Sequence, residues 1–267
     1  MSVLLAAERL HLRHPRAERD AVRDVSFALH AAEIVALVGP NGSGKSTLLA
    51  GLAGELAPRS GRVTLDGVDL SRVPRRKRAL RIARLPQEPA CPEGLTVEQL
   101  VSHGRHPHRG AFAPLGARDR RAVTEALTAF DLMDLRQRAV ETLSGGERRR
   151  AWLGLVLAQE PEILLLDEPT TALDLRQRFE LLALLARAHR ERGLSLLVSL
   201  HDLEEAAALA QRVAVLHRGR LYEAAHPEAA LRAETLRDVF GVDARVEKED
   251  GFVRVRIQGP ATPLRSL

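Results

Sequence analysis

The sequence predicts an α/β fold in which a parallel β-sheet presents polar residues at the carboxyl ends of its strands. Three apolar runs have the composition of buried strands, at residues 34–38, 163–166 and 194–200. A glycine-rich segment follows the first run and polar residues follow the other two directly, and open parallel sheets bind their ligands at this edge. A helical pattern follows the first two runs, as the crossover between parallel strands requires.

The strongest motif directly follows the first apolar run and reads GPNGSGKST over residues 39–47. It fits G-x-x-x-x-G-K-[ST], a loop between a strand and a helix that surrounds phosphate oxygens with backbone N–H groups. We expect Lys45 to contact the β- and γ-phosphates of a nucleotide and the Ser46 hydroxyl to bind Mg²⁺. The predicted nucleotide-binding residues of the loop are Gly39, Pro40, Asn41, Gly42, Ser43, Gly44, Lys45, Ser46 and Thr47.

An antiparallel β ribbon is predicted before the loop, over residues 3–27, with a polar turn near residues 14–20. Beyond the helix of the loop, a turn at 60–61 leads to a strand, and Asp66-Gly67 is typical of a hairpin turn. The arginine-rich segment 72–84 indicates a basic helix with a solvent-exposed face.

These elements predict a P-loop NTPase fold with a RecA-like core over residues 1–88 and 160–225. Residues 89–159 have helical periodicity, and we interpret them as an inserted α-helical subdomain. In that subdomain Thr96 caps a helix that runs to His103. The remaining predicted elements are a loop at 104–116, helices at 118–132 and 148–159, and a C-terminal extension at 226–267 with a helix over 227–240 and a β-hairpin around Asp250-Gly251.

Three histidines, His103, His106 and His108, crowd one stretch of this subdomain. Histidine is the commonest metal ligand, so a metal site is conceivable there. No cysteine or carboxylate lies within the cluster, and a surface loop is the simpler interpretation.

A carboxylate pair, Asp167 and Glu168, ends the second apolar run. Neighbouring side chains of a strand point to opposite faces, so one can face Mg²⁺ while the other faces a water molecule in line with the γ-phosphate. We expect Asp167 to hold Mg²⁺ through water and Glu168 to act as general base. His201 follows the third apolar run at the same edge, where we expect it to be functional.

A second anion site is predicted at residues 143–147, which read LSGGE and precede the helix over 148–159. Ser144 can cap this helix, and Gly145 and Gly146 leave backbone N–H groups open at its start. Two phosphate-binding helix starts in one chain require an explanation.

The composition of the 267-residue chain argues against several classes of function. The formal net charge is +5, but aromatic residues make up only 3%, without the aromatic–basic alternation that stacks bases, so we expect no specific nucleic-acid partner. The single cysteine, Cys91, allows no intrachain disulfide. No uncharged apolar run reaches the roughly 18 residues of a membrane span, and the first ten residues do not fit a secretory leader.

Taken in order, the motifs resemble those of the ATP-binding subunits of ABC transporters, over about residues 3–225. The resemblance implies that Gln87 senses the γ-phosphate, binds Mg²⁺ and communicates with a membrane partner. It also implies that Ser144, Gly145 and Gly146 contact the γ-phosphate bound to a second copy of the chain. Asp174 would act across that dimer, and His201 would contact the γ-phosphate.

This arrangement explains the two anion sites, because two chains would enclose two ATP molecules between them. The resemblance implies that closure of the homodimer pulls on integral-membrane permease subunits and that hydrolysis releases them. It places the chain on the cytoplasmic face of the cell membrane, with a periplasmic or lipoprotein substrate-binding protein as an indirect partner. An aromatic residue stacks on adenine in many such subunits; residues 10–14 offer none here, and His14 is the candidate substitute.

Within the family, residues 85–87, 93–97, 104–107 and 239–242 are similar to importers of ferric siderophores, haem and cobalamin, which we rank in that order. We expect the surface around Gln87 and residues 104–108 to dock the permease, with Arg105 as a contact. An exporter subunit, or an ABC protein acting on nucleic acid or ribosomes, stays open. The single Lys45 motif and the lack of heptads count against the latter.

Overall fold

The structure is a computed structural model that describes the chain except residues 1, 16, 90–92, 110–113, 250–251 and 262–267. Cys91 and the predicted turn at Asp250-Gly251 therefore lie outside the described residues. The chain forms two compact units, the first from Met1–Leu70 and Leu197–Leu267 and the second from Ser71–Leu196. The predicted division into a core and an inserted subdomain follows motifs rather than compactness, and it stays a prediction.

In the first unit, an antiparallel sheet has the strand order β2-β1-β4-β5. The ribbon predicted before the loop is confirmed, because β1 (Val3–Leu12) pairs with β2 (Val22–His30). The predicted turn at residues 60–61 is instead part of β4 (Ser60–Leu65), which pairs with β1 and with β5 (Val68–Asp69). Asp66 and Gly67 both have positive φ, at 48° and 75°, as a two-residue hairpin turn requires.

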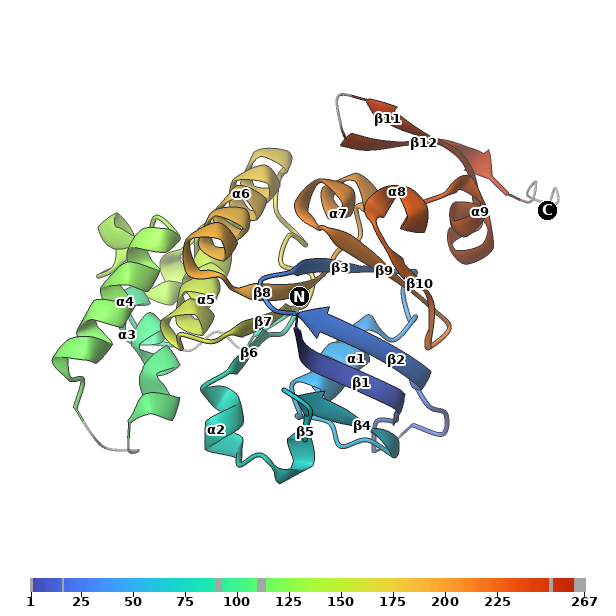
Figure 1. Cartoon of the computed structure of the whole chain (residues 1–267). Helices are drawn as coiled ribbons and strands as arrows, with labels where there is room; N and C mark the ends of the chain where they lie inside the picture. Colours follow the sequence, from blue (N-terminus) through green and yellow to red (C-terminus); the bar gives the residue numbers. More distant parts are fainter. Residues whose placement is uncertain (1, 16, 90–92, 110–113, 250–251, 262–267) are drawn as a thin grey trace. The chain divides into compact units, whose positions relative to one another are not determined.

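A second set of strands in this unit has the order β10-β9-β3-β8. The strands are β10 (Arg220–Ala225), β9 (Arg212–His217), β3 (Ile34–Val38) and β8 (Ser195–Ser199). The boundary between the two units falls inside β8. β3 and β9 are parallel. All five residues of β3 are buried, as its continuous apolar sequence predicts. Helix α7 (Leu203–Leu209) packs against β3, and α1 (Lys45–Leu52) packs against β1 (Figure 1).

The C-terminal part of the first unit is less regular than predicted. The single helix expected over 227–240 is broken into α8 (Pro227–Ala230), α9 (Ala233–Thr235) and a π-helical turn (Leu236–Phe240). The break lies at Leu231 and Arg232, which leave helical geometry, and the side chain of Leu231 is fully buried. The predicted hairpin is confirmed as β11 (Val242–Glu249) paired with β12 (Phe252–Pro260).

In the second unit, the strand order is β8-β7-β6, and β7 (Ile163–Leu166) pairs in parallel with β6 (Ile82–Leu85). The basic helix predicted over 72–84 is wrong in its extent. A 3₁₀ turn (Leu70–Arg72) and the short α2 (Arg75–Ala79) are its helical parts, because residues 82–85 pair with β7 as a strand. A long helix, α6 (Leu175–Arg192), follows β7 and ends at the left-handed Gly193.

Three helices of this unit pack together, α3 (Val97–Ser102), α4 (Ala117–Ala129) and α5 (Gly145–Ala158) (Figure 1). The predicted cap of α3 is confirmed, because Thr96 and Gln99 form a reciprocal capping box. The predicted loop at 104–116 begins instead as a 3₁₀ helix, His103–His108, and short 3₁₀ turns lie at Met133–Leu135 and Val140–Thr142. None of the helices described is both long and apolar enough to cross a membrane.

Candidate active site

The glycine-rich loop in the first unit leaves the carboxyl end of β3 and turns into α1. Gly39 and Gly44 have φ values of 153° and 105°, a region that residues with side chains rarely adopt. A Cβ at Gly39 would lie 2.1 Å from the carbonyl oxygen of Leu216, and one at Gly44 would lie 2.4 Å from that of Ala21. A side chain at either position would therefore displace backbone.

The start of α1 is suited to an anion. Its N-cap residue, Gly44, offers no side-chain cap, and the first turn contains no acidic residue. The buried Lys45 lies in the same turn, with Nζ donating to the carbonyl oxygens of Gly39 at 2.9 Å and Pro40 at 3.4 Å. A helix start without a side-chain cap, the helix dipole and a lysine in one place fit a phosphate group.

Two predicted histidines belong to the same unit. His14 Nε2 lies 3.0 Å from Thr47 Oγ1, in the first turn of α1. The Leu200 N–H donates to the Leu37 carbonyl oxygen of β3 at 3.1 Å, so His201 leaves the sheet at the same edge as the loop. The expected contacts of His14 with adenine and of His201 with the γ-phosphate stay predictions.

In the second unit, the carboxylate of Asp167 is buried at the end of β7. Arg84, on the neighbouring strand β6, lies with Nη2 at 3.4 Å from Asp167 Oδ2. The sequence does not identify this partner, because Arg84 ends an arginine-rich segment whose pattern predicts a helix with a solvent-exposed face. Only the pairing of β6 with β7 places Arg84 beside a buried carboxylate.

Glu168, the predicted general base, and Gln87, the expected sensor of the γ-phosphate, lie side by side. Gln87 Nε2 donates to Glu168 Oε2 at 2.7 Å, and the Thr171 hydroxyl donates to the same oxygen at 3.2 Å. Glu168 has φ at 46°, an uncommon value for a residue with a side chain. The pair arises because β6 and β7 are adjacent and parallel, so the segments that follow them emerge at one edge.

A further residue of this unit, Arg149 on α5, is absent from the sequence prediction. Its guanidinium donates to main-chain carbonyl oxygens in the segments that follow β6 and β7. Burial lowers the pKa of Arg149 to about 10, against the opposing influence of Asp167 and Glu168. Three consecutive arginines occupy 148–150, and nothing in their local sequence distinguishes the middle one.

The start of α5 is capped by its own side chains. Ser144 Oγ accepts the N–H of Glu147 at 3.3 Å, and Glu147 Oε2 accepts the N–H of Ser144 at 2.8 Å. Hydrogen bonds from the backbone and the side chain of Ser144 to the Glu147 carboxylate lower the pKa of Glu147. The predicted cap by Ser144 is confirmed, and the structure adds a carboxylate that the sequence analysis did not consider.

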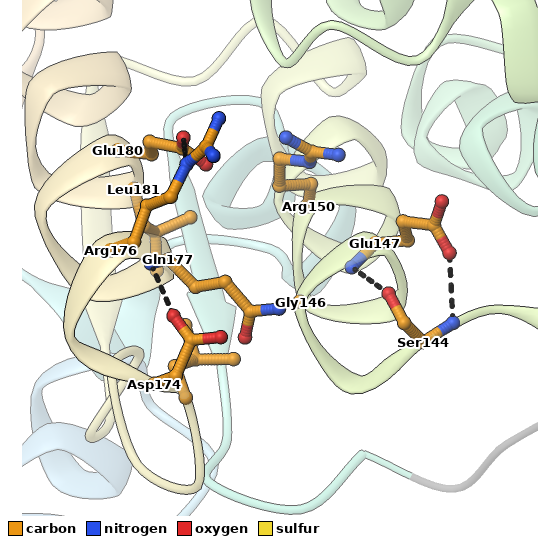
Figure 2. Close-up of a pocket in the computed structure, with 10 residues that line it drawn as sticks. Ser144, Gly146, Glu147, Arg150, Asp174, Arg176, Gln177, Glu180 and Leu181 are labelled. Atoms are coloured by element: carbon orange, nitrogen blue, oxygen red, sulfur yellow. Dashed lines mark hydrogen bonds and ion pairs between the residues drawn. The ribbon is translucent and has the colours of Figure 1, made fainter.

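A cavity of about 350 Å³ lies between the starts of α5 and α6 (Figure 2). Asp174 caps α6, with Oδ1 accepting the N–H of Gln177 at 2.8 Å. A Cβ at Gly146 would come within 2.9 Å of the end of the Gln177 side chain, so the two helices approach closely at this point. Residues expected to act on a second chain thus surround one cavity, which is lined by Ser144, Gly146, Arg150, Asp174, Gln177 and Glu180.

The expected role of Arg105 as a surface contact is wrong. Its side chain is fully buried and bonds Asp119 Oδ1 at 2.9 Å, the Ala158 carbonyl oxygen at 2.7 Å and Glu160 Oε2 at 2.8 Å. Arg105 therefore holds the 3₁₀ helix against α4 and α5. The exposed side chains nearby are His103 and His106, and within the described ranges no cluster of His, Cys, Asp or Glu is arranged to hold a metal.

Comparison with known proteins gives a family match and full-length relatives. The model of the family described as ABC transporter matches residues 22–171. The chain is 38% identical over 231 residues to the probable siderophore transport system ATP-binding protein YusV of Bacillus subtilis, covering 86% of this chain and 84% of that one. It is 42% identical over 251 residues to the hemin import ATP-binding protein HmuV of Pseudomonas fluorescens, covering 92% and 95%.

Solved structures agree with these relatives. An ABC transporter described as metal-chelate type, in an inward-facing conformation, superposes with a TM-score of 0.82 at 25% identity, over 97% of this chain and 98% of that chain. The dimeric ATP-binding cassette MJ0796, in a post-hydrolysis state with ADP and Pi, superposes with a TM-score of 0.74 at 25% identity, over 84% and 99%. These matches confirm the predicted α/β P-loop fold.

Proposed function

The chain belongs to the ABC transporter family as an ATPase that uses ATP and Mg²⁺, and we propose that it powers uptake of a ferric siderophore through a membrane permease. The observation that carries the proposal is a relative named for siderophore transport that matches this chain over most of both lengths. The full-length superposition on a metal-chelate type transporter supports it further.

Haem is the second candidate cargo. The relative named for hemin import is 42% identical, and the alignment covers 95% of that relative's length. This match favours haem as much as the match to the siderophore-transport relative favours a siderophore. Cobalamin, the third candidate, stays a prediction. The cargo does not bind this subunit in the proposed arrangement, so its residues do not distinguish the candidates.

In this proposal the first unit binds the ATP phosphates. Lys45 neutralises phosphate charge, and the loop glycines and the start of α1 direct N–H groups to the oxygens. We propose Ser46 and Gln87 as oxygen donors for Mg²⁺, the ligand type this ion prefers, with Asp167 holding the ion through water. When bound, Mg²⁺ neutralises charge on the β- and γ-phosphates.

Glu168 is the proposed general base. Its carboxylate is held by Gln87 and Thr171, so its orientation is fixed before water is bound. It would accept a proton from the water that attacks the γ-phosphorus atom, and ADP would leave with its electrons on the bridging oxygen. The Gln87 amide donates to Glu168 Oε2, so a movement of Gln87 changes the position of the base.

The cavity around Ser144 and Asp174 is the proposed contact with a second copy of the chain. Ser144, Gly145 and Gly146 would meet the γ-phosphate held by the Lys45 loop of the partner. The superposition on one chain of the dimeric cassette MJ0796, solved with ADP and Pi, supports this arrangement. Each protomer would then complete the active site of the other.

The remaining partners are proposals of the same kind. We propose that this chain binds the permease subunits at the cytoplasmic face of the membrane. The contact surface on this chain would lie near Gln87 and the exposed His106. A substrate-binding protein outside the membrane would act on the permease and not on this chain. We propose no specific role with nucleic acid.

The proposal is tested in a strain that lacks the gene and is complemented with the wild-type chain or with Glu168→Gln. We expect the wild type, but not Glu168→Gln, to restore uptake of a ⁵⁵Fe-labelled ferric hydroxamate, whereas growth on haem iron does not depend on the gene. Restored use of haem with unchanged hydroxamate uptake would favour the haem importer. If neither uptake depends on the gene, both cargo assignments are wrong.

A further inference from the structure

The guanidinium of Arg149 satisfies its hydrogen-bond donors entirely with main-chain oxygen atoms. Five carbonyl oxygens accept from it, as many as arginine has N–H donors. The distances are 2.9 Å to Gln87 and Asp167, 3.0 Å to Glu168, 3.1 Å to Pro169 and 3.3 Å to Pro86. One side chain therefore ties together two segments that are far apart in the sequence.

Burial of this charge costs free energy, and the hydrogen bonds to main-chain oxygens offset part of that cost. Across the residues that the structure describes, Arg149 forms no ion pair, and its pKa is lowered by burial. A buried cation without a paired carboxylate is rare in proteins. The neighbouring Arg148 and Arg150 are more exposed and bond none of these carbonyl oxygens.

The bonded carbonyl oxygens surround the proposed base. Glu168 has a left-handed backbone, which persists only where its surroundings hold it. Arg149 bonds the carbonyl oxygens of Asp167, Glu168 and Pro169, before, at and after that residue. The same guanidinium bonds the carbonyl oxygen of Gln87, whose side chain contacts the Glu168 carboxylate.

We propose that Arg149 is a positioning residue that joins α5, the Gln87 segment and the Glu168 segment into one rigid element. The inference rests on the proposed function and deepens it. Helix α5 is capped by Ser144, on the cavity proposed to receive the partner's nucleotide. An ordered start of α5 would thus fix Gln87 and Glu168 through Arg149, without contact between this arginine and the nucleotide.

The test compares Arg149→Lys and Arg149→Met with the adjacent Arg148→Met. Lysine keeps the charge but can reach fewer carbonyl oxygens, because it has fewer donors in a different geometry. We expect kcat to fall about 10²-fold in Arg149→Met, as for misplacement of a catalytic group by roughly 1 Å. Arg149→Lys should recover part of that loss, and Arg148→Met should keep the wild-type rate. Binding of a fluorescent ATP analogue should change less than about twofold in all three.

A second measurement identifies Glu168 as the group through which Arg149 acts. In the Arg149→Lys/Glu168→Gln double variant, single-turnover hydrolysis should equal that of Glu168→Gln alone, because a misplaced base and a missing base are not independent losses. Losses that multiply would overturn the proposal. Wild-type kcat in both Arg149 variants would overturn it as well, and if Arg149→Met does not fold, Arg149→Lys decides.

Hydrogen exchange separates this proposal from the proposed function. We expect amide protection at residues 87–88, 167–168 and 170–171 to fall in Arg149→Lys and not in Arg148→Met. Unchanged protection would overturn the positioning role even if Glu168 is the base. If protection falls but Glu168→Gln hydrolyses ATP normally, the positioning role holds and the assignment of the base fails.

Discussion

Two helix starts in this protein were predicted to bind phosphate, and the structure builds them in opposite ways. The start of α1 has the left-handed Gly44, no side-chain cap and the cation Lys45. The start of α5 has a complete capping box between Ser144 and Glu147, and its charged group is an acid. A helix start that binds phosphate by itself needs N–H groups that no side chain caps, together with positive charge. By that criterion α1 is a complete site, whereas α5 is suited to meet a phosphate that is already held elsewhere.

Glu168→Gln should have the largest effect, because it leaves both helix starts intact and removes only the proton acceptor. Hydrolysis should fall by about 10²–10⁴-fold, the range for loss of general-base assistance. ATP bound at α1 then persists, so a closed dimer should accumulate with Mg-ATP. Single-turnover hydrolysis and light-scattering mass measure these outcomes. Near-normal hydrolysis would place the base elsewhere, with His201 as the next candidate.

Lys45→Ala breaks the first helix start. A charged hydrogen bond contributes about 1.5–3 kcal/mol, so the Kd for ATP should rise about 10- to 100-fold. Without nucleotide at the start of α1, the start of α5 in the partner has no γ-phosphate to contact, and no dimer should form. Titration calorimetry and light scattering measure both, with the exposed Lys77→Ala as control. A Lys45→Ala chain that dimerises with Mg-ATP would contradict the assigned order of the two starts.

His14→Ala tests the role of His14, whose side chain contacts Thr47 at the start of α1. If His14 stacks on adenine, the Kd for ATP should rise about fivefold, from about 1 kcal/mol of stacking. His14→Phe should then restore affinity. If the contact with Thr47 matters instead, Phe should behave like Ala. Unchanged affinity in both variants would remove His14 from the nucleotide site.

Glu147→Gln should have the smallest effect, on the α5 start. Removing a negative charge near an incoming phosphate should strengthen ATP-dependent dimerisation about two- to fivefold, from about 0.3–1 kcal/mol at a helix terminus. The pKa of Glu147 is lowered by its bonds from Ser144, so its cap stabilises the fold above its usual pKa of 4.5 and is lost as the pH falls through the lowered value. The increase in ATP-dependent dimerisation of Glu147→Gln over the wild type should therefore be equal at pH 6 and pH 8. Weaker dimerisation of Glu147→Gln than of the wild type would show that the capping box is itself needed.

Local sequence determined the two helix starts and most strands. The loop glycines at 39–47, the cap at Ser144 and the carboxylates at Asp167 and Glu168 are encoded within a few residues, because backbone conformation and capping are short-range effects. The family match agrees with these motifs. The extent of helices was predicted less well. The segment 72–84 was expected to be one helix, but it contains a short helix and a strand, because pairing with β7 outweighs its charge pattern.

The tertiary structure alone decided what the arginines do. Arg105, Arg84 and Arg149 look like surface residues in an arginine-rich sequence, yet each is turned inward. Among the consecutive arginines at 148–150, helical phase and the packing of α5 against β6 turn the middle one toward the carbonyl oxygens beside Glu168. The left-handed Glu168 and its bond from Gln87 likewise depend on segments about 80 residues apart. Contacts between such distant segments arise only when the strands pair, and no local pattern in the sequence records them.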